Sequence, residues 1–131
     1  MHEREAIIID IVVTIPKDKY DDDLMETIFY LENDDSYAFW TMNKIPKNVS
    51  IGDRIYFVKD NHIESSMKIF DIEYNATNKC IVTNKIWTGK IAFCLDDLKF
   101  VEEYIECKGF QGFRYKWWRE PFGKGETNEK K

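Results

Sequence analysis

The sequence predicts an α+β fold, a curved, barrel-like sheet with two flanking helices. Apolar and polar residues alternate with a period of two along several short segments, as in half-buried strands. Residues 21–31 and 96–105 carry apolar residues at helical spacing. The chain has 131 residues, 44% of them hydrophobic, which suits one domain with one core. We expect that domain to span residues 1–122.

The first strand and the first helix are predicted from residues 5–15 and 21–31. Isoleucine and valine recur at alternate positions of the strand until Pro16 ends it. Three aspartates from Asp21 precede an apolar helix face. That face comprises Leu24, Met25, Ile28, Phe29 and Leu31. Consecutive helical positions point in different directions, so we interpret the aspartates as helix capping and not as a metal site.

A β-hairpin is predicted in the middle of the chain. Residues 37–42 read as a strand, with a loop over residues 43–48. Turn residues at Gly52-Asp53 and at Asp60–His62 then bound a strand over 54–58 and a longer one over 63–72.

The last third of the chain is predicted to hold three more strands and the second helix. After a turn over residues 74–78, strands are expected over 80–87 and 90–94. Asp96-Asp97 would cap a helix in which Leu98, Val101 and Ile105 share a face, and Gly109 would end it. A final strand over 110–118 precedes a polar tail, 123–131, that we expect to be disordered.

Composition and cysteine spacing argue against a membrane protein, a secreted protein and a cysteine metal site. No apolar run approaches the roughly 20 residues of a membrane span, and the start lacks the features of a signal peptide, so we expect a cytoplasmic protein without a membrane partner. Cys80, Cys94 and Cys107 have no metal-site spacing, and we interpret them as buried apolar residues. The net charge is −5, yet bases outnumber acids in residues 108–131.

Two stretches of the sequence resemble segments of a known family. Gly52-Asp53, followed by Ile55-Tyr56-Phe57 and a strand ending in a carboxylate, is similar to the central hairpin of the PUA-like superfamily, which includes the ASCH and EVE domains. The segment from Gly109 to Tyr115 is similar to its late glycine-aromatic segment, which closes the barrel. The resemblance implies a small barrel that binds nucleic acid, RNA among the candidates, or a modified nucleotide.

The resemblance to EVE domains also implies a pocket near an early strand. Trp40 would stack on the ligand, and Asn43 or Lys44 would read its polar edge. The alternative is that Trp40 belongs to the core and Lys44 to a solvated loop. The ASCH pattern Gly-x-Lys-x-x-Glu-x-Arg has no counterpart here, so a function that depends on it is not implied.

The C-terminal segment combines aromatic rings with positive charge. Arg114, Tyr115 and Trp117 are the candidates here for base stacking and phosphate contact, in company with Lys116 and Trp118. Trp87, before Thr88-Gly89, is a further aromatic expected near the mouth of a cleft. Packing of these rings in the core is the alternative explanation.

Catalytic patterns are weak, and we expect a binding module in preference to an enzyme. No cofactor or metal is implied by any motif. Asp71 and Glu73 share one strand face, as carboxylates of a small hydrolase acting on a nucleoside or nucleic acid do, although alternating charge on an exposed strand explains them more simply. A protein-interaction domain with an exposed aromatic patch is a further alternative.

Overall fold

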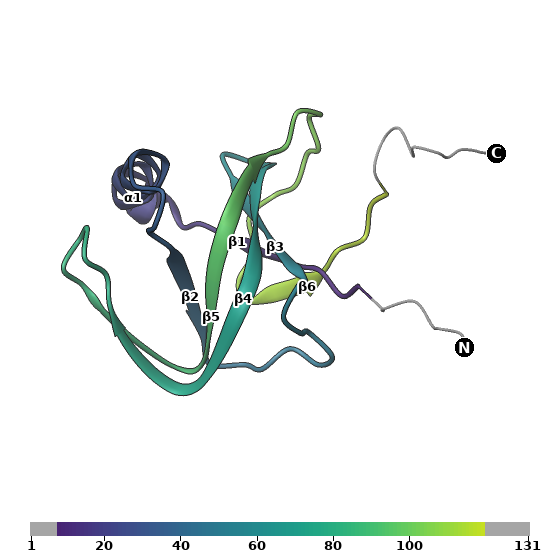
Figure 1. Cartoon of the computed structure of the whole chain (residues 1–131). Coiled ribbons are helices and arrows are strands. Elements are labelled where there is room, and N and C mark those ends of the chain that lie inside the picture. Colours follow the sequence, from purple (N-terminus) through teal and green to yellow (C-terminus); the bar gives the residue numbers. More distant parts are fainter. Residues whose placement is uncertain (1–7, 120–131) are drawn as a thin grey trace.

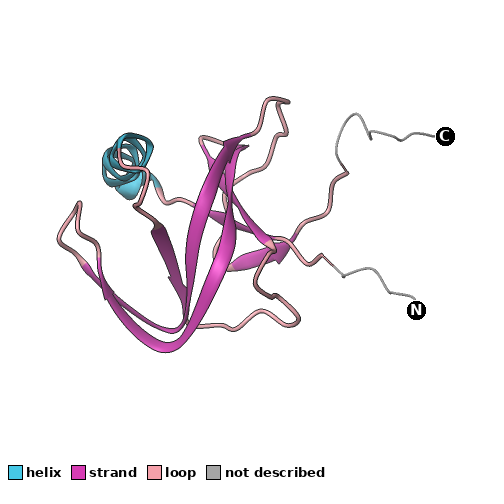
Figure 2. Cartoon of the chain, viewed as in Figure 1, coloured by secondary structure: helices cyan, strands magenta, loops and turns pink. Residues whose placement is uncertain are grey.

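A computed structural model describes residues 8–119 of the chain, which form six strands and one α-helix (Figures 1 and 2). Within the described residues the elements follow this order: β1 (Ile11–Thr14), the 3-10 turn η1 (Lys17–Lys19), α1 (Tyr20–Glu32), β2 (Ala38–Met42), β3 (Arg54–Lys59), β4 (His62–Lys79), β5 (Ile86–Phe100) and β6 (Phe113–Tyr115). The predicted tail, 123–131, and the start of the predicted first strand lie outside the described residues.

The strands form a single sheet in the order β2-β5-β4-β3-β1-β6. Only β1 and β3 run parallel, with Ile11 opposite Ile55, and every other neighbouring pair is antiparallel. The edge strands β2 and β6 do not pair with each other, so the sheet is not closed into a barrel. The α+β class is confirmed, and the sheet is open.

Both faces of the sheet carry apolar residues that are shielded from water. The larger cluster lies on the face toward α1 and includes Ile55, Ile69 and Phe93, all 0% exposed. A smaller cluster gathers Val12 and Ile63 on the other face, where the segment after β5 covers the sheet. Burial on both faces explains why the consecutive residues Ile11, Val12 and Val13 of β1 are all apolar.

The central hairpin is confirmed. Asp60 and Asn61 both have positive φ, 56° and 62°, as a two-residue hairpin turn requires. The strand after it, β4, is far longer than predicted and runs to Lys79, so the turn expected over residues 74–78 and the strand over 80–87 are wrong. Pairing with β5 down to Lys79 opposite Ile86 satisfies the backbone where the sequence offered turn residues.

The predicted helix over residues 96–105 is also wrong, and α1 is the one α-helix among the described residues. Residues 96–100 continue β5, where Lys99 and Phe100 lie opposite Ser66 and Ser65 of β4. Asp97 has φ 55°, which a helix does not accommodate. Strand pairing thus overrides a helical spacing of apolar residues.

Helix α1 is placed as predicted but packs differently. Its expected apolar face is turned to solvent: Leu24, Met25, Ile28 and Leu31 are 46–57% exposed. Tyr20 and Tyr30 contact the core instead.

The bent β4–β5 hairpin brings its turn toward α1 (Figure 1). The Cys80 thiol there donates to Glu26 over 3.2 Å, and Lys85 pairs with Asp22. Burial raises the pKa of Glu26.

Two further sequence expectations concern the cysteines and the membrane. All three cysteines are free and buried, which confirms their interpretation as core residues. No helix within residues 8–119 has the length and apolar character needed to cross a membrane.

Candidate functional site

An open pocket of about 530 Å³ lies where the segment before β1, the loop between β2 and β3, and the end of β6 meet. Its lining combines apolar surface with charges of both signs. The lining residues are Ile8, Ile9, Asp10, Lys47, Asn48, Tyr115 and Lys116. An aromatic ring beside convergent polar groups suits a ligand with a flat face and a polar edge.

Strand β6 carries Tyr115 to this pocket by pairing with β1. Tyr115 lies opposite Ile11, and the N–H of Lys116 donates to the carbonyl oxygen of Asp10 over 2.9 Å. Phe113 and Tyr115 share one side of the strand, because side chains alternate along it. Phe113 packs against the core, and its ring meets Tyr115 edge to face with centroids 5.5 Å apart.

The hydroxyl of Tyr115 is tied to the loop between β2 and β3. It accepts the N–H of Lys47 over 3.0 Å and donates to the carbonyl oxygen of the same residue over 3.3 Å. The next residue, Asn48, adopts a left-handed φ of 64°. These bonds fix the ring against the loop while the residue stays 45% exposed. The pocket therefore presents an aromatic surface that is both held and accessible.

Two lysines place positive charge on the pocket walls. Lys47 is exposed. Lys116 Nζ lies 5.1 Å from the centroid of the Tyr56 ring and 5.3 Å from that of Trp118, and these cation–π contacts hold it beside the pocket. Phosphate oxygens are the natural ligands of lysines in such positions.

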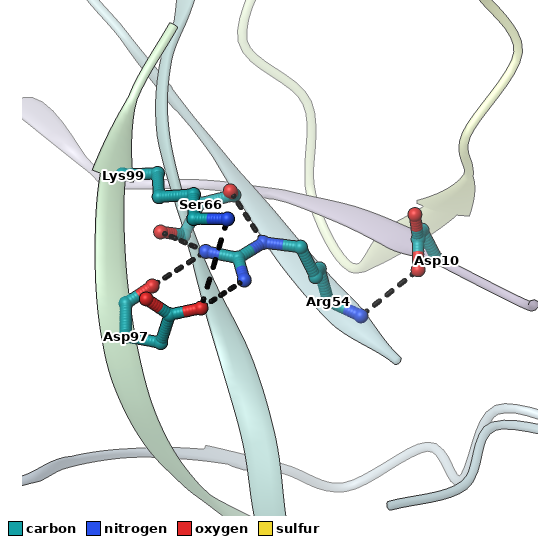
Figure 3. Close-up of polar contacts among 5 residues, drawn as sticks. All are labelled: Asp10, Arg54, Ser66, Asp97 and Lys99. Atoms are coloured by element: carbon teal, nitrogen blue, oxygen red, sulfur yellow. Dashed lines mark hydrogen bonds and ion pairs between the residues drawn. The ribbon is translucent and has the colours of Figure 1, made fainter. Parts of the chain in front are cut away.

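Asp10 adds a half-buried carboxylate to the same pocket. Its Oδ1 accepts the backbone N–H of Arg54 over 2.9 Å (Figure 3). Burial raises the pKa of Asp10, and this effect exceeds the opposing influence of the Arg54 hydrogen bond and of the charge on Lys116. A carboxylate that is partly removed from water is stabilised by any additional hydrogen-bond donor that a ligand brings.

The side chain of Arg54 belongs to a separate, structural cluster (Figure 3). Nε donates to Ser66 Oγ over 2.8 Å, and Nη1 pairs with Asp97 Oδ2 over 2.9 Å. Nη2 donates to the carbonyl oxygens of Ser66 and Asp97. The hydrogen bond from Arg54 lowers the pKa of Asp97. Because each guanidinium nitrogen has a partner, this cluster ties β3 to β4 and β5.

The remaining C-terminal candidates do not line the pocket. Trp117 is 51% exposed and meets Trp118 edge to face, with centroids 5.0 Å apart. The guanidinium carbon of Arg114 lies 4.1 Å from the centroid of the Phe110 ring. Arg114 is exposed, so its charge is accessible to solvent.

The candidates from the first half of the chain and from β5 are placed elsewhere. Trp40 is half-buried and packs against the core, with its ring centroid 5.6 Å from that of Phe57. Trp87 is half-buried, and Lys19 Nζ lies 5.4 Å from its ring centroid. Asn43 and Lys44 are exposed in the loop after β2. The pocket lining includes none of these four residues.

A second cluster of polar atoms joins Asp71, Glu73 and Cys94 on β4 and β5. One ligand atom from each lies within 4.8 Å of the others, so together they could hold a metal ion. Burial and the two carboxylates raise the pKa of the Cys94 thiol to about 11, which makes it a neutral thiol at neutral pH and a poor nucleophile. Asp71 accepts the N–H of Ile72, and Glu73 accepts the amide of Asn78.

Sequence reasoning singled out Tyr115 and missed its partners. Asp10, Lys47 and Asn48 come from segments far from β6 in the chain. The β1–β6 pairing brings Asp10 to Tyr115, and hydrogen bonds to the Tyr115 hydroxyl bring the loop with Lys47 and Asn48. One local signal was available: Asp10 interrupts a run of isoleucines and valines, and a carboxylate inside a buried strand calls for a partner.

Comparison of the chain with known proteins gives no match to a family model, a curated protein or a solved structure.

Proposed function

We propose that this chain binds nucleic acid or a modified nucleotide by stacking an unpaired base on Tyr115. The observation that carries the proposal is the fixed, half-exposed ring of Tyr115 in a pocket with lysines on its walls. Stacking of a base on an aromatic side chain is worth about 1–3 kcal/mol and tolerates different bases. A ring whose orientation is already set loses little further entropy on binding.

The distribution of charge suits a small, local contact. Lys47 and Lys116 line the pocket, and Arg114 adds an exposed charge on the same strand segment. The whole chain is nevertheless acidic, with a net charge of −5. Few phosphates can be neutralised at one time, so we expect affinity to fall only gently with added salt.

The resemblance to the PUA-like superfamily supports the same proposal. The turn at Gly52-Asp53 leads into β3, and β6 follows the turn at Gly112, where φ is 78°. Those are the two segments on which the resemblance rests. Membership in that family is part of the proposal, although the sheet is open where the family has a barrel.

Fluorescence anisotropy of short labelled RNA and DNA single strands tests the proposal. We expect saturable binding at low salt by the wild-type chain and at least a tenfold loss for Tyr115→Ala. Tyr74→Ala is the matched control, because Tyr74 is 62% exposed and lies on β4, outside the pocket lining. Equal affinity of the two variants would contradict the proposal.

A protein-interaction role is the second candidate, and the exposed face of α1 is the observation that favours it. Leu24, Met25, Ile28 and Leu31 form apolar surface of the kind that partners cover. Ile28→Asp would then abolish self-association or partner binding while leaving the Tyr115 pocket intact. Monodisperse behaviour of the wild-type chain in sedimentation, together with unaltered behaviour of Ile28→Asp, would count against self-association.

A further inference from the structure

The second carboxylate oxygen of Asp10, Oδ2, bears on which base the pocket binds. Oδ1 accepts the N–H of Arg54, and among the described residues Oδ2 takes part in no hydrogen bond or ion pair. Asp10 also lines the pocket that holds the ring of Tyr115. An acceptor that is half withdrawn from water and faces a cavity is matched by a ligand that brings N–H donors.

The backbone of Arg54 keeps that oxygen in place. The side chain of Arg54 is anchored to Ser66 and Asp97, so the N–H that holds Oδ1 belongs to a rigid part of β3. Three charged groups act on the pKa of Asp10: Asp53 raises it, and Arg54 and Lys116 lower it. Arg54 thus positions Asp10, whose side chain lines the pocket.

The four common bases differ in what they present to a carboxylate. Guanine carries two adjacent donors on its Watson–Crick edge, N1–H and the 2-amino group. Adenine and cytosine each place an acceptor nitrogen beside their single amino group, and uracil flanks its one N–H with two carbonyl oxygens. A carboxylate only accepts hydrogen bonds, so these acceptors repel it.

We propose that the Tyr115 pocket selects guanine, with Asp10 accepting from the N1–H and 2-amino groups while the ring stacks on Tyr115 and Lys47 meets the phosphate. This inference rests on the proposed function and adds base selectivity to it. A paired contact of this kind discriminates against the wrong base by roughly tenfold or more.

Titration of the full chain with GMP, IMP and AMP, followed by tryptophan fluorescence, tests the selectivity. IMP keeps N1–H but lacks the 2-amino group, so we expect affinity to fall in the order GMP, IMP, AMP, with about a tenfold difference or more between the ends. A uridine-rich RNA tetramer with a single guanine separates a nucleotide ligand from an RNA ligand. Preference for the guanine-containing tetramer over its adenine counterpart also supports the inference.

Asp10→Asn supplies the matched variant. Its amide oxygen still accepts the N–H of Arg54, while its amino group faces the donors of guanine, so GMP affinity should drop to that of AMP. Asp34→Asn, an exposed turn position, should leave the preference unchanged. If Asp10→Asn fails to fold, the difference in affinity between GMP and IMP for the wild-type chain still tests whether the 2-amino group is recognised.

The outcomes separate the two proposals. Equal affinity of the wild-type chain for GMP and AMP, with both weakened by Tyr115→Ala, would overturn guanine selection and leave the base-stacking function standing. Absence of binding to any nucleotide or tetramer would overturn both.

Discussion

The two edge strands of the sheet each carry a prominent aromatic residue, and of these two rings only that of Tyr115 lines the pocket. Trp40 on β2 packs against the core beside Phe57, and α1 contacts the same core through Tyr20 and Tyr30. Tyr115 on β6 extends past the last core residue of its strand and faces an open pocket. Residue type predicts both as stacking candidates. What covers each edge of the sheet decides which one can bind.

Removal of Trp40 should give the largest loss of stability. Trp40→Ala leaves a cavity beside Phe57, and we expect the free energy of unfolding to fall by about 3 kcal/mol. Urea denaturation measures this loss. A fold of unchanged stability that had lost its ligand binding would instead place Trp40 in the binding site.

Substitution of Arg54 should affect stability, because its side chain ties β3 to β4 and β5 away from the pocket. Arg54→Met removes the donors to Ser66 and Asp97 and takes these partners from two oxygens of the buried Ser66, so we expect a loss of about 2 kcal/mol in the free energy of unfolding. Thermal unfolding followed by circular dichroism measures it. Lys99→Met is the control, because Lys99 lies 3.9 Å from Asp97 at an exposed position. Equal losses for the two variants would contradict the role given to Arg54.

Tyr115→Ala should separate binding from folding. The ring is 45% exposed, so we expect a loss of stability of about 1 kcal/mol, much smaller than that of Trp40→Ala. Nucleotide affinity should fall at least tenfold in the same variant. Tyr115→Phe keeps the ring and loses only the anchor to Lys47, and should bind with intermediate affinity. Full affinity of Tyr115→Ala would remove the ring from the binding site.

Asp10 and Asp97 should give opposite dependence of stability on pH. The pKa of Asp97 is lowered, so its contribution is present above the unfolded pKa and is lost as the pH falls through the folded value. The pKa of Asp10 is raised, so the folded chain holds that proton more tightly and loses stability as the pH rises from 3.8 through the raised value.

Urea unfolding of Asp97→Asn and Asp10→Asn between about pH 3 and 6 measures these two effects. With rising pH, the stability of the wild type relative to Asp97→Asn should increase, and its stability relative to Asp10→Asn should decrease. Parallel curves for the two variants would contradict the assignments.

The contact between Lys19 and Trp87 should give the smallest effect. Lys19→Ala removes a cation–π contact with a half-buried ring, worth about 0.5–1 kcal/mol. We expect a small shift in tryptophan emission and no change in nucleotide affinity. A loss of affinity would extend the binding surface to Trp87.

Local signals sufficed for the bounds of the central hairpin and of α1, because turn residues and the spacing of apolar residues act over a few neighbours. The interpretation of the aspartates as caps is wrong: Lys19 is the N-cap without a side-chain hydrogen bond, and Asp22 and Asp23 in the first turn pair with Lys85 and Lys59. They failed for residues 96–100, where pairing of Lys99 with Ser66 replaces a helical pattern with a strand. The pocket could not be predicted from local signals. Tyr115 was predicted from the aromatic and basic residues around it in the sequence. Asp10 joins it through long-range pairing of β6 with β1, and Lys47 through a long-range hydrogen bond to its hydroxyl.

Nuclear magnetic resonance mapping of the ligand contact tests the account most directly, since it reads both edges of the sheet in one experiment. On titration of the isotope-labelled chain with GMP or a short single strand, we predict that shifts of amide signals concentrate at Asp10, Lys47, Asn48, Tyr115 and Lys116. Signals from Trp40 and Trp87 should stay in place. Shifts centred on Trp40 and Trp87, with those around Tyr115 unmoved, would contradict the assignment of the pocket beside β6.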